Sequence, residues 1–373
     1  MIMKVPQFEP FMGTEEYIAI KDCFDKNWIT EGPKMKEFSS LLCGLMGAEF
    51  AVFAPNGTLA LYLGLRSIGI KPGDEVIVPD FTFIGSATSV EMAGAVPVFA
   101  DVNRDNFQID IDSCEKYLTE KTKAIMPVHM YGMAANMSGV LNFAKRHNLL
   151  VIEDAAQAVG VRYNGKHCGT FGDVGCFSFF ADKTITTGEG GFVVAKNEKI
   201  YKDLLYLRNQ GRLERGSFIH PQMGYNFRMT DIQLAVGIVQ FGKLPEIIEK
   251  KSRIIGLYRE KLGNVEEIQF TKVEPGSTHI PFRVAVICKD AHRLMDSLSK
   301  KGIEGRTFFY PLHRQPCFQY LKDKGQNSQV LEDAQFPNAV YGYENGMCLP
   351  SFVGITEEQI NYVCENIKAF YAE

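Results

Sequence analysis

The sequence predicts an α/β fold: a doubly wound, mainly parallel sheet followed by a smaller C-terminal α/β domain. Between residues 50 and 195, short apolar runs alternate with helix-like segments, which indicates parallel strands joined by right-handed crossovers. The apolar runs are continuous, as expected when helices cover both faces of a sheet. A length of 373 residues, 46% of them hydrophobic, allows one large domain and a smaller second one.

Each element of the large domain follows from a short stretch of sequence. Apolar runs bounded by Gly, Pro, Asn or Asp predict strands, and the amphipathic segments between them predict helices. Strands are expected at 48–54, 74–80, 96–102, 122–132 and 149–155, and helices at 56–69, 83–94 and 138–148.

The alternation changes after residue 175. "GCFSFFA" and "GGFVVAK", at 175–181 and 190–196, suggest a hairpin that adds antiparallel pairing to the sheet. Residues 231–262 predict a long helical stretch interrupted near Pro245. We therefore expect a large domain over 1–245, which includes an N-terminal arm, and a small domain over 246–373.

Composition and charge argue against several classes of function. A net charge of −4 gives no basic surface for nucleic acid, and no apolar run approaches the length of a membrane span. The N-terminus lacks the pattern of a signal peptide. The nine cysteines are scattered, with no C-x-x-C pair, which indicates reduced thiols in a cytoplasmic protein. We expect no bound metal.

Four groups of residues follow predicted strands, at the edge of an open α/β sheet where ligands bind. Each group alone has a structural alternative: a helix cap, core packing or a solvated turn. The groups are Gly57 and Thr58 of "NGT", Phe81 and Phe83 of "FTF", Asp154 with Gln157, and Lys183 before a glycine-rich bend.

Pyridoxal phosphate accounts for all four groups together. Its aldehyde needs a lysine amine, and its pyridine nitrogen needs an anionic partner to act as an electron sink. Its phosphate suits N–H groups at a helix N-terminus, and its flat ring suits an aromatic side chain. An amine in partly apolar surroundings has a lowered pKa, so Lys183 could attack a carbonyl and then carry a proton.

Several blocks of the sequence resemble the DegT/StrS-type sugar aminotransferases, which are pyridoxal-phosphate enzymes of fold type I. The blocks include "GDEVIVPDFTF", "VIEDAAQAVG", "GTFGDVGCFSFFADKTITTGEGGF" and "GYNFRMTDIQ", in order over about residues 28–240. Weaker similarity continues in "FFYPLHRQPCF" and "CLPSFVGITEEQ". Within the family, "KTITTGEGG" and "GYNFRMT" are most similar to the GDP-perosamine synthases.

The resemblance implies a homodimer with shared active sites and a role for each residue at the site. His129 and Tyr131 are expected to support the site rather than react. The implied contacts are a Schiff base with Lys183, Asp154 at the pyridine nitrogen, Gln157 at the ring hydroxyl, Phe83 stacked on the ring, Gly57, Thr58 and Ser178 at the phosphate, and Asn226 reaching the phosphate from the second subunit.

The implied reaction has two halves, with Lys183 moving the proton in both. L-glutamate gives its amino group to pyridoxal 5'-phosphate, which becomes pyridoxamine 5'-phosphate, and a keto sugar nucleotide then accepts the group. The expected acceptor is a nucleotide-linked 4-keto-6-deoxyhexose, and the product is an amino sugar for polysaccharide or glycan biosynthesis. Family members in which histidine replaces the lysine are dehydratases, so Lys183 favours transamination.

The resemblance weakens in the C-terminal part, which bears on the acceptor. "STHIPFRVAV" has Pro281 and Phe282 where many relatives carry a Tyr or Trp pair, and "FADK" differs from the "FGNK" or "FPTK" of relatives. Substrate contacts are expected from Trp28, Arg306 and His313, with a packing or surface role as the alternative for each.

Three other functions stay open at this point. The same transamination on a small phosphorylated ketone would suit the divergent C-terminal region. A dehydratase or racemase is disfavoured by Lys183 together with Gln157. A non-catalytic regulatory protein is disfavoured because such proteins usually lose the lysine or its aspartate partner, and this chain keeps both.

Overall fold

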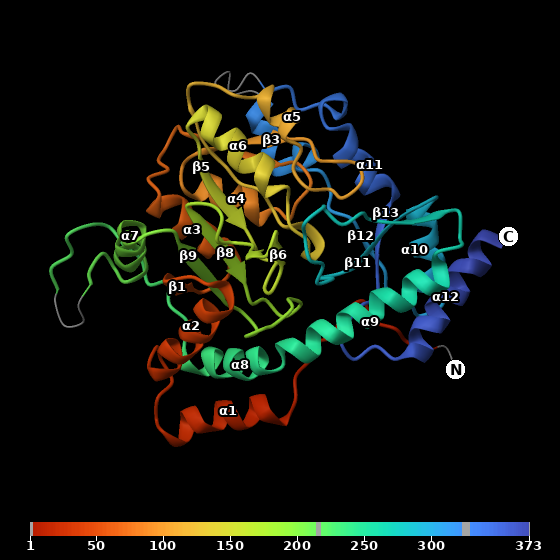
Figure 1. Ribbon diagram of the computed structural model, residues 1–373, viewed down its shortest axis with the longest axis horizontal. Helices are drawn as coiled ribbons and strands as arrows, with labels where there is room; N and C mark the ends of the chain where they lie inside the picture. The colour runs from red at the N-terminus through yellow and green to blue at the C-terminus, as the bar shows by residue number, and fades with distance from the viewer. Residues whose placement is uncertain (1–2, 214–217, 323–328, 373) are drawn as a thin grey trace.

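A seven-stranded sheet forms the larger part of the fold in the computed structural model, which describes residues 3–213, 218–322 and 329–372 (Figure 1). The strand order is β1-β9-β8-β5-β4-β2-β3. Six strands run in one direction and β9 runs against them, between β1 and β8. The predicted doubly wound, mainly parallel sheet is confirmed. Its strands are β1 Phe50–Ala54, β2 Glu75–Pro79, β3 Val96–Ala100, β4 Thr122–Ile125, β5 Leu150–Asp154, β8 Val174–Ser178 and β9 Gly191–Ala195.

The predicted hairpin is present, and it lies inside the sheet rather than at its edge. β8 pairs in parallel with β5, and the chain then returns along β9, which pairs antiparallel with both β8 and β1. A tight return of this kind needs no crossover helix. Residues 179–190 therefore stay at the edge of the sheet where the parallel strands end.

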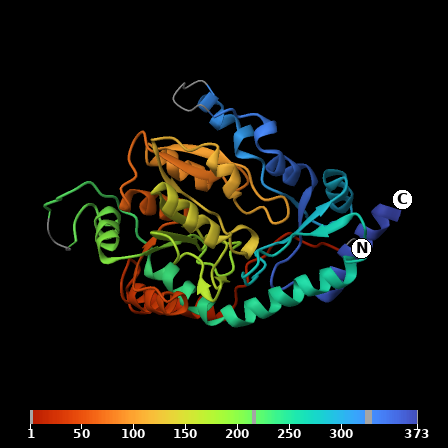
Figure 2. The same ribbon diagram turned by 45° about the horizontal axis from the view of Figure 1, so that its top comes forward.

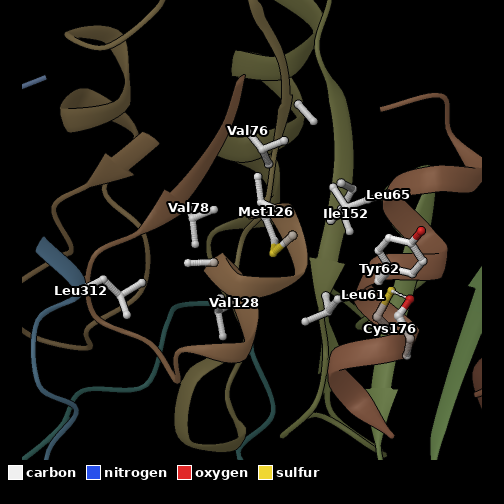
Figure 3. Packing of buried hydrophobic residues seen from close by; sticks show 14 of the residues in the cluster. Leu61, Tyr62, Leu65, Val76, Val78, Met126, Val128, Ile152, Cys176 and Leu312 are labelled. Atoms are coloured by element: carbon white, nitrogen blue, oxygen red, sulfur yellow. Dashed lines mark hydrogen bonds between the residues drawn. The ribbon is translucent and has the colours of Figure 1, made fainter. Parts of the chain in front are cut away.

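Helices cover both faces of this sheet (Figures 1 and 2). Helix α3 shows how the sequence sets one of them: the Asn56 side chain accepts a hydrogen bond of 2.9 Å from Leu59 N, which caps the helix at its first turn. Figure 3 shows Leu61, Tyr62 and Leu65 of α3 in one buried cluster with side chains of the strands. The helices around the sheet are α1 Thr14–Asp25, α2 Pro33–Met46, α3 Gly57–Ser67, α4 Gly85–Met92, α5 Ile111–Glu115, α6 Met137–His147, α7 Glu198–Arg208 and α8 Asp231–Gly242.

The strand expected at 122–132 was too long. β4 ends at Ile125, and Met130–Gly132 forms a short 3-10 turn. Tyr131 in this turn has a φ of 55°, which a strand does not allow. Its backbone N donates a 2.7 Å hydrogen bond to Gln157 Oε1. The hydrogen-bond acceptor for this N–H is therefore a side chain and not the backbone of a neighbouring strand.

The C-terminal part is built on a second, fully antiparallel sheet with the order β10-β11-β13-β12. The long helical stretch breaks at Lys243, before Pro245, and the following helix α9 leads from the large sheet to the small one (Figure 1). The remaining elements are β6 Arg162–Tyr163, β7 Lys166–His167, α9 Leu244–Leu262, β10 Ile268–Phe270, β11 Val284–Cys288, α10 Ala291–Lys300, β12 Arg306–Thr307, α11 Pro337–Asn345, β13 Gly346–Leu349 and α12 Glu357–Ala372.

Contacts cross the predicted domain boundary near residue 245 in both directions. Val5 pairs with Ile303 beside the small sheet, so the N-terminal arm lies against the C-terminal part. Phe308 and Phe336 pack in the same cluster as the side chains of the large sheet. The division at 245 therefore stays a prediction. In the part of the chain that the structure describes, none of the helices combines the length and apolar character needed to span a membrane.

A buried carboxylate fixes the chain around the end of β5. Glu153 Oε1 accepts hydrogen bonds from Phe171 N and Gly172 N at 2.6 and 2.7 Å, and Oε2 accepts one from Gly169 N at 2.6 Å. His129 Nε2 lies 2.9 Å from Oε2, and it carries the ring proton because Ala135 N donates to Nδ1. One side chain thereby ties two loops to the strand that ends in Asp154.

We expect Glu153→Gln to lower the free energy of unfolding by about 2–4 kcal/mol, because an amide NH₂ would face the backbone donors that the carboxylate now accepts. Urea unfolding of the two proteins at the same concentration measures the change. Glu260→Gln on the exposed face of α9 is the matched control, with no change expected. Equal loss in both variants would contradict the role given to Glu153.

Candidate active site

Lys183 lies in the connection between β8 and β9, at the edge where the parallel strands end. Its side chain is only 15% exposed, and Nζ lies 4.4 Å from the centre of the Phe282 ring. Burial lowers the pKa of the Lys183 amine, an effect that the neighbouring carboxylate of Asp182 opposes. The lysine is therefore a buried amine with a raised neutral fraction, as its sequence context suggested, and not a solvated turn residue.

Asp154 is the last residue of β5, and its carboxylate is buried. Ser86 Oγ donates a 2.7 Å hydrogen bond to Oδ2, and Ala156 N donates one of 3.1 Å to Oδ1. Burial raises the pKa of Asp154, while the Ser86 hydrogen bond and the positive charge of Lys183 act in the opposite direction. The site thus holds a carboxylate that gains stability from any cation placed beside it.

Ser86 was missed by the sequence analysis. It lies in the first turn of α4, directly after the loop that follows β2, so the rule that ligand residues follow parallel strands could have found it. Thr82 Oγ1 lies 3.0 Å from Ser86 Oγ and continues the same hydrogen-bonded chain away from Asp154.

The N-terminus of α3 faces the end of β8. A Cβ atom on Gly57 would lie 2.9 Å from Ser178 Cβ and 3.1 Å from Ser178 Oγ, so only glycine leaves this approach open. Across Gly85, Thr58 and Phe83 lie close together: a Cβ at residue 85 would lie 3.1 Å from Thr58 Oγ1 and 3.3 Å from Phe83 Cδ1. The open N–H groups of the helix suit an anion, and the Phe83 side chain, 60% exposed, is free to cover a flat ring.

Gln157 and the loop after β4 support one another. Gln157 is buried, and its Oε1 accepts the hydrogen bond from Tyr131 N that shapes the 3-10 turn. Among the described residues, the hydrogen-bond contact of Nε2 is one of 3.8 Å with Met130 Sδ. The amide NH₂ is thus the end of Gln157 that could meet a ring hydroxyl, and this role stays a prediction.

Asn226 and Trp28 contact segments other than the loop of Lys183. Asn226 is exposed and pairs with Asn209 at the end of α7, in a segment that projects away from the sheet (Figure 1). Trp28 follows α1 and packs over Gly32, where a Cβ would lie 1.7 Å from its indole nitrogen. Their expected contacts with cofactor and substrate stay predictions.

Arg306 and His313 differ in exposure and in their hydrogen-bond partners. Arg306 is exposed on β12 and lines a polar cavity together with Gln7 and Glu304. His313 is buried: Nδ1 lies 2.7 Å from Asp80 Oδ2, and Nε2 lies 3.0 Å from Asp333 Oδ1. Both ring nitrogens of His313 are therefore engaged, and contact of either residue with substrate stays a prediction.

The described residues offer pyridoxal phosphate an amine, a carboxylate and an open helix end. A buried amine and a buried carboxylate attract one another across the site, and the glycine at residue 57 leaves the end of α3 open. Three residues near the lysine were not assigned a role from the sequence: Asp182, Phe282 and Arg283. Asp182 could have been found from the sequence because it directly precedes the lysine, whereas Arg283 comes from a distant segment.

Comparison with known proteins gives matches along nearly the whole chain. The model of the DegT/DnrJ/EryC1/StrS aminotransferase family matches residues 10–368. A GDP-perosamine synthase of Escherichia coli O157:H7 is 36% identical over 373 residues, covering 99% of each chain. A crystal structure of S. venezuelae DesV superimposes with a TM-score of 0.91 at 29% identity, covering 99% of each chain. The PLP form of a putative sugar aminotransferase, Spr1654 of Streptococcus pneumoniae, gives 0.91 at 26% identity and 98% coverage of each chain.

We expect Asp154→Asn to stabilise the cofactor-free chain at neutral pH, on the order of 1 kcal/mol, because it removes a carboxylate whose ionisation burial opposes. As the pH falls through the raised pKa toward the ordinary value of 3.8, folded wild-type protein takes up this proton first. The advantage of the variant should then disappear.

Urea unfolding across this pH range measures the difference between the two proteins. Asp105→Asn, which removes a carboxylate from an exposed ion pair with Lys272, is the control and should show no such pH-dependent advantage. A wild-type chain that is the more stable one at neutral pH would show that burial does not penalise Asp154.

Proposed function

Because the chain belongs to the DegT/DnrJ/EryC1/StrS aminotransferase family, whose enzymes are PLP-dependent, we propose that it transfers an amino group from L-glutamate to a nucleotide-linked 4-keto-6-deoxyhexose. The product would be a 4-amino sugar for polysaccharide or glycan biosynthesis. The observation that carries this proposal is the buried Lys183 amine with the buried Asp154 carboxylate at the same edge of the sheet.

Lys183 and Asp154 have separate tasks in this reaction. When bound, the cofactor supplies an aldehyde that takes up the amino group and a ring that withdraws electrons from the neighbouring carbon. Lys183 would remove a proton at Nζ and return it, and its lowered pKa favours this because it raises the fraction of neutral amine. Asp154, oriented by Ser86, holds a negative charge where the positively charged ring nitrogen would lie.

Other residues would hold and orient the cofactor. Gly57, Thr58 and Ser178 surround the start of α3, where N–H groups and a hydroxyl can bind a phosphate. Phe83 would cover the ring on its open face. Because these groups lie on the ends of rigid strands and helices, they would keep the bound ring in one orientation.

The acceptor is proposed from a relative and from the reaction class. The matching E. coli protein is called a GDP-perosamine synthase, which names a GDP-linked sugar. Arg306 offers an exposed guanidinium in a polar cavity of the C-terminal part, and such a group suits a phosphate. A small phosphorylated ketone would suit the same groups and is the alternative that the test must separate.

A homodimer would complete the site. Phe218, Ile219 and Met223 are each more than three-quarters exposed, in the segment that also carries Asn226. Large apolar side chains exposed in one short segment can mark an interface with another protein chain. We propose that this segment packs on a second copy of the chain and brings Asn226 to the phosphate of its site.

The acceptor is tested by exposing the cofactor-loaded enzyme to L-glutamate, desalting it, and adding GDP-4-keto-6-deoxymannose. We expect the visible absorbance of the cofactor to return and an amino sugar nucleotide to appear by mass spectrometry. Lys183→Ala should show neither change, because the amine proposed to move the proton is then missing.

A return of absorbance with a small phosphorylated ketone, and not with the sugar nucleotide, would replace the proposed acceptor. Turnover by Lys183→Ala would overturn the role of the lysine itself.

Mixing two inactive variants tests the shared site. Lys183→Ala and Asn226→Ala should each transaminate poorly at limiting cofactor. Random mixing of their subunits should restore about one quarter of the wild-type activity, because half of the dimers then contain one intact site out of two. Asn264→Ala, at an exposed asparagine of the C-terminal part, is the control and should be active without mixing. Absence of any recovery would mean that Asn226 serves its own subunit.

A further inference from the structure

A buried network of charged and polar groups lies beside Lys183. Arg283 Nη2 donates a 2.5 Å hydrogen bond to Asp182 Oδ2, and Arg283 Nη1 donates to Gln7 Oε1. The side chains of Asp182 and Arg283 are 8% and 6% exposed. The network joins three distant segments: the β8–β9 connection, the residue before β11 and the N-terminal arm.

The second oxygen of Asp182 faces the lysine. Asp182 Oδ1 lies 3.5 Å from Lys183 Nζ, and it is buried with no hydrogen-bond partner among the residues that the structure describes. A buried carboxylate oxygen without a partner is costly, whereas a charge-assisted hydrogen bond is strong. A small side-chain rotation would close the distance to Nζ, so Oδ1 is placed to accept from the amine.

Arg283 balances the charge of this arrangement. A single buried carboxylate beside Lys183 would hold the lysine in its protonated form and oppose proton transfer. The guanidinium neutralises Asp182 through Oδ2, and its carbon Cζ lies 4.7 Å from the centre of the same Phe282 ring that Nζ approaches. The pair can therefore guide the amine without holding its proton permanently.

We propose that Asp182, held in place by Arg283, is a positioning residue that receives Lys183 Nζ through Oδ1 whenever the lysine is not covalently bound. This inference rests on the proposed function only in taking Lys183 as the reacting lysine. The two residues depend on one another, since the aspartate without the arginine would be a buried unpaired charge.

Other charged groups near Lys183 also affect its protonation, and they are the same in every variant. Asp154 lies across the site, and Glu9 is at the exposed rim of the small cavity that the network lines. Lys251 is buried behind Arg283 and donates a 2.8 Å hydrogen bond to Ser351 O. Burial, and then the nearby Arg283, lower the pKa of Lys251 to about 7.

The test measures the reactivity of the lysine itself in the full chain stripped of cofactor. A trace amine-acylating reagent is applied over a range of pH, and labelling of the Lys183 peptide is quantified by mass spectrometry. Asp182→Asn removes the carboxylate that favours the ammonium form, so labelling at neutral pH should be about tenfold faster. Arg283→Gln leaves Asp182 unneutralised, so labelling should be about tenfold slower.

Two further variants separate positioning from general damage. The double variant Asp182→Asn/Arg283→Gln restores neutrality, and its labelling should return toward the wild-type rate. Asp105→Asn, which removes an exposed carboxylate, should leave the labelling of Lys183 unchanged. Thermal unfolding confirms that each chain is folded at the temperature of labelling.

Opposite shifts in the two single variants support the proposal, because loosened packing would expose the amine and move both in the same direction. Equal shifts, or no shift in either variant, overturn it. The outcome is independent of the aminotransferase assignment: wild-type protein that ignores L-glutamate but shows the opposite labelling shifts would refute the proposed function and leave the Asp182–Arg283 pair standing.

Discussion

The hydrogen bonds of Glu153 are the constraint on which the rest of the site depends. Successive residues of a strand point to opposite faces of the sheet, so Glu153 and Asp154 serve different sides. Glu153 binds three backbone N–H groups and His129, which fixes the loops beside β5. Asp154 then projects from a rigid strand end toward Ser86. The carboxylate proposed to meet the cofactor is thus placed by a structural carboxylate directly before it in the chain.

The electrostatics of the site follow from burying charges in pairs. Asp154 and Lys183 each lose solvation, and each is partly compensated by the other. Asp182 and Arg283 form a second buried pair beside Lys183. Buried ion pairs of this kind add little to stability, since desolvation offsets much of the attraction. Their value here is that they hold polar atoms in defined places before any ligand arrives.

Much of the large domain could be predicted from sequence, because each strand of a buried parallel sheet gives a local pattern of apolar residues. Continuous apolar runs gave the strands, and the rule for strand ends led to Gly57, Phe83, Asp154 and Lys183. The strand expected at 122–132 was too long because its last residues form a buried turn. Apolar character alone does not distinguish a buried turn from a buried strand. Arg283 and Gln7 reach the lysine from distant segments, and no local pattern reports such a meeting. The role proposed for Asn226 involves a second subunit, and a local sequence pattern does not report contacts between chains.

The position of β9 has a consequence for how the protein is made. Among the described strands, β1 pairs with β9 alone, with Phe50 opposite Ala195. The first strand of the sheet to leave the ribosome therefore has no neighbour until most of the large domain has been synthesised. The N-terminal arm waits still longer, because Val5 pairs with Ile303. Contacts between residues so far apart in sequence slow folding and leave an apolar strand edge exposed meanwhile. The large sheet is thus completed late, and until then the growing chain carries an unpaired strand edge of the kind that promotes aggregation.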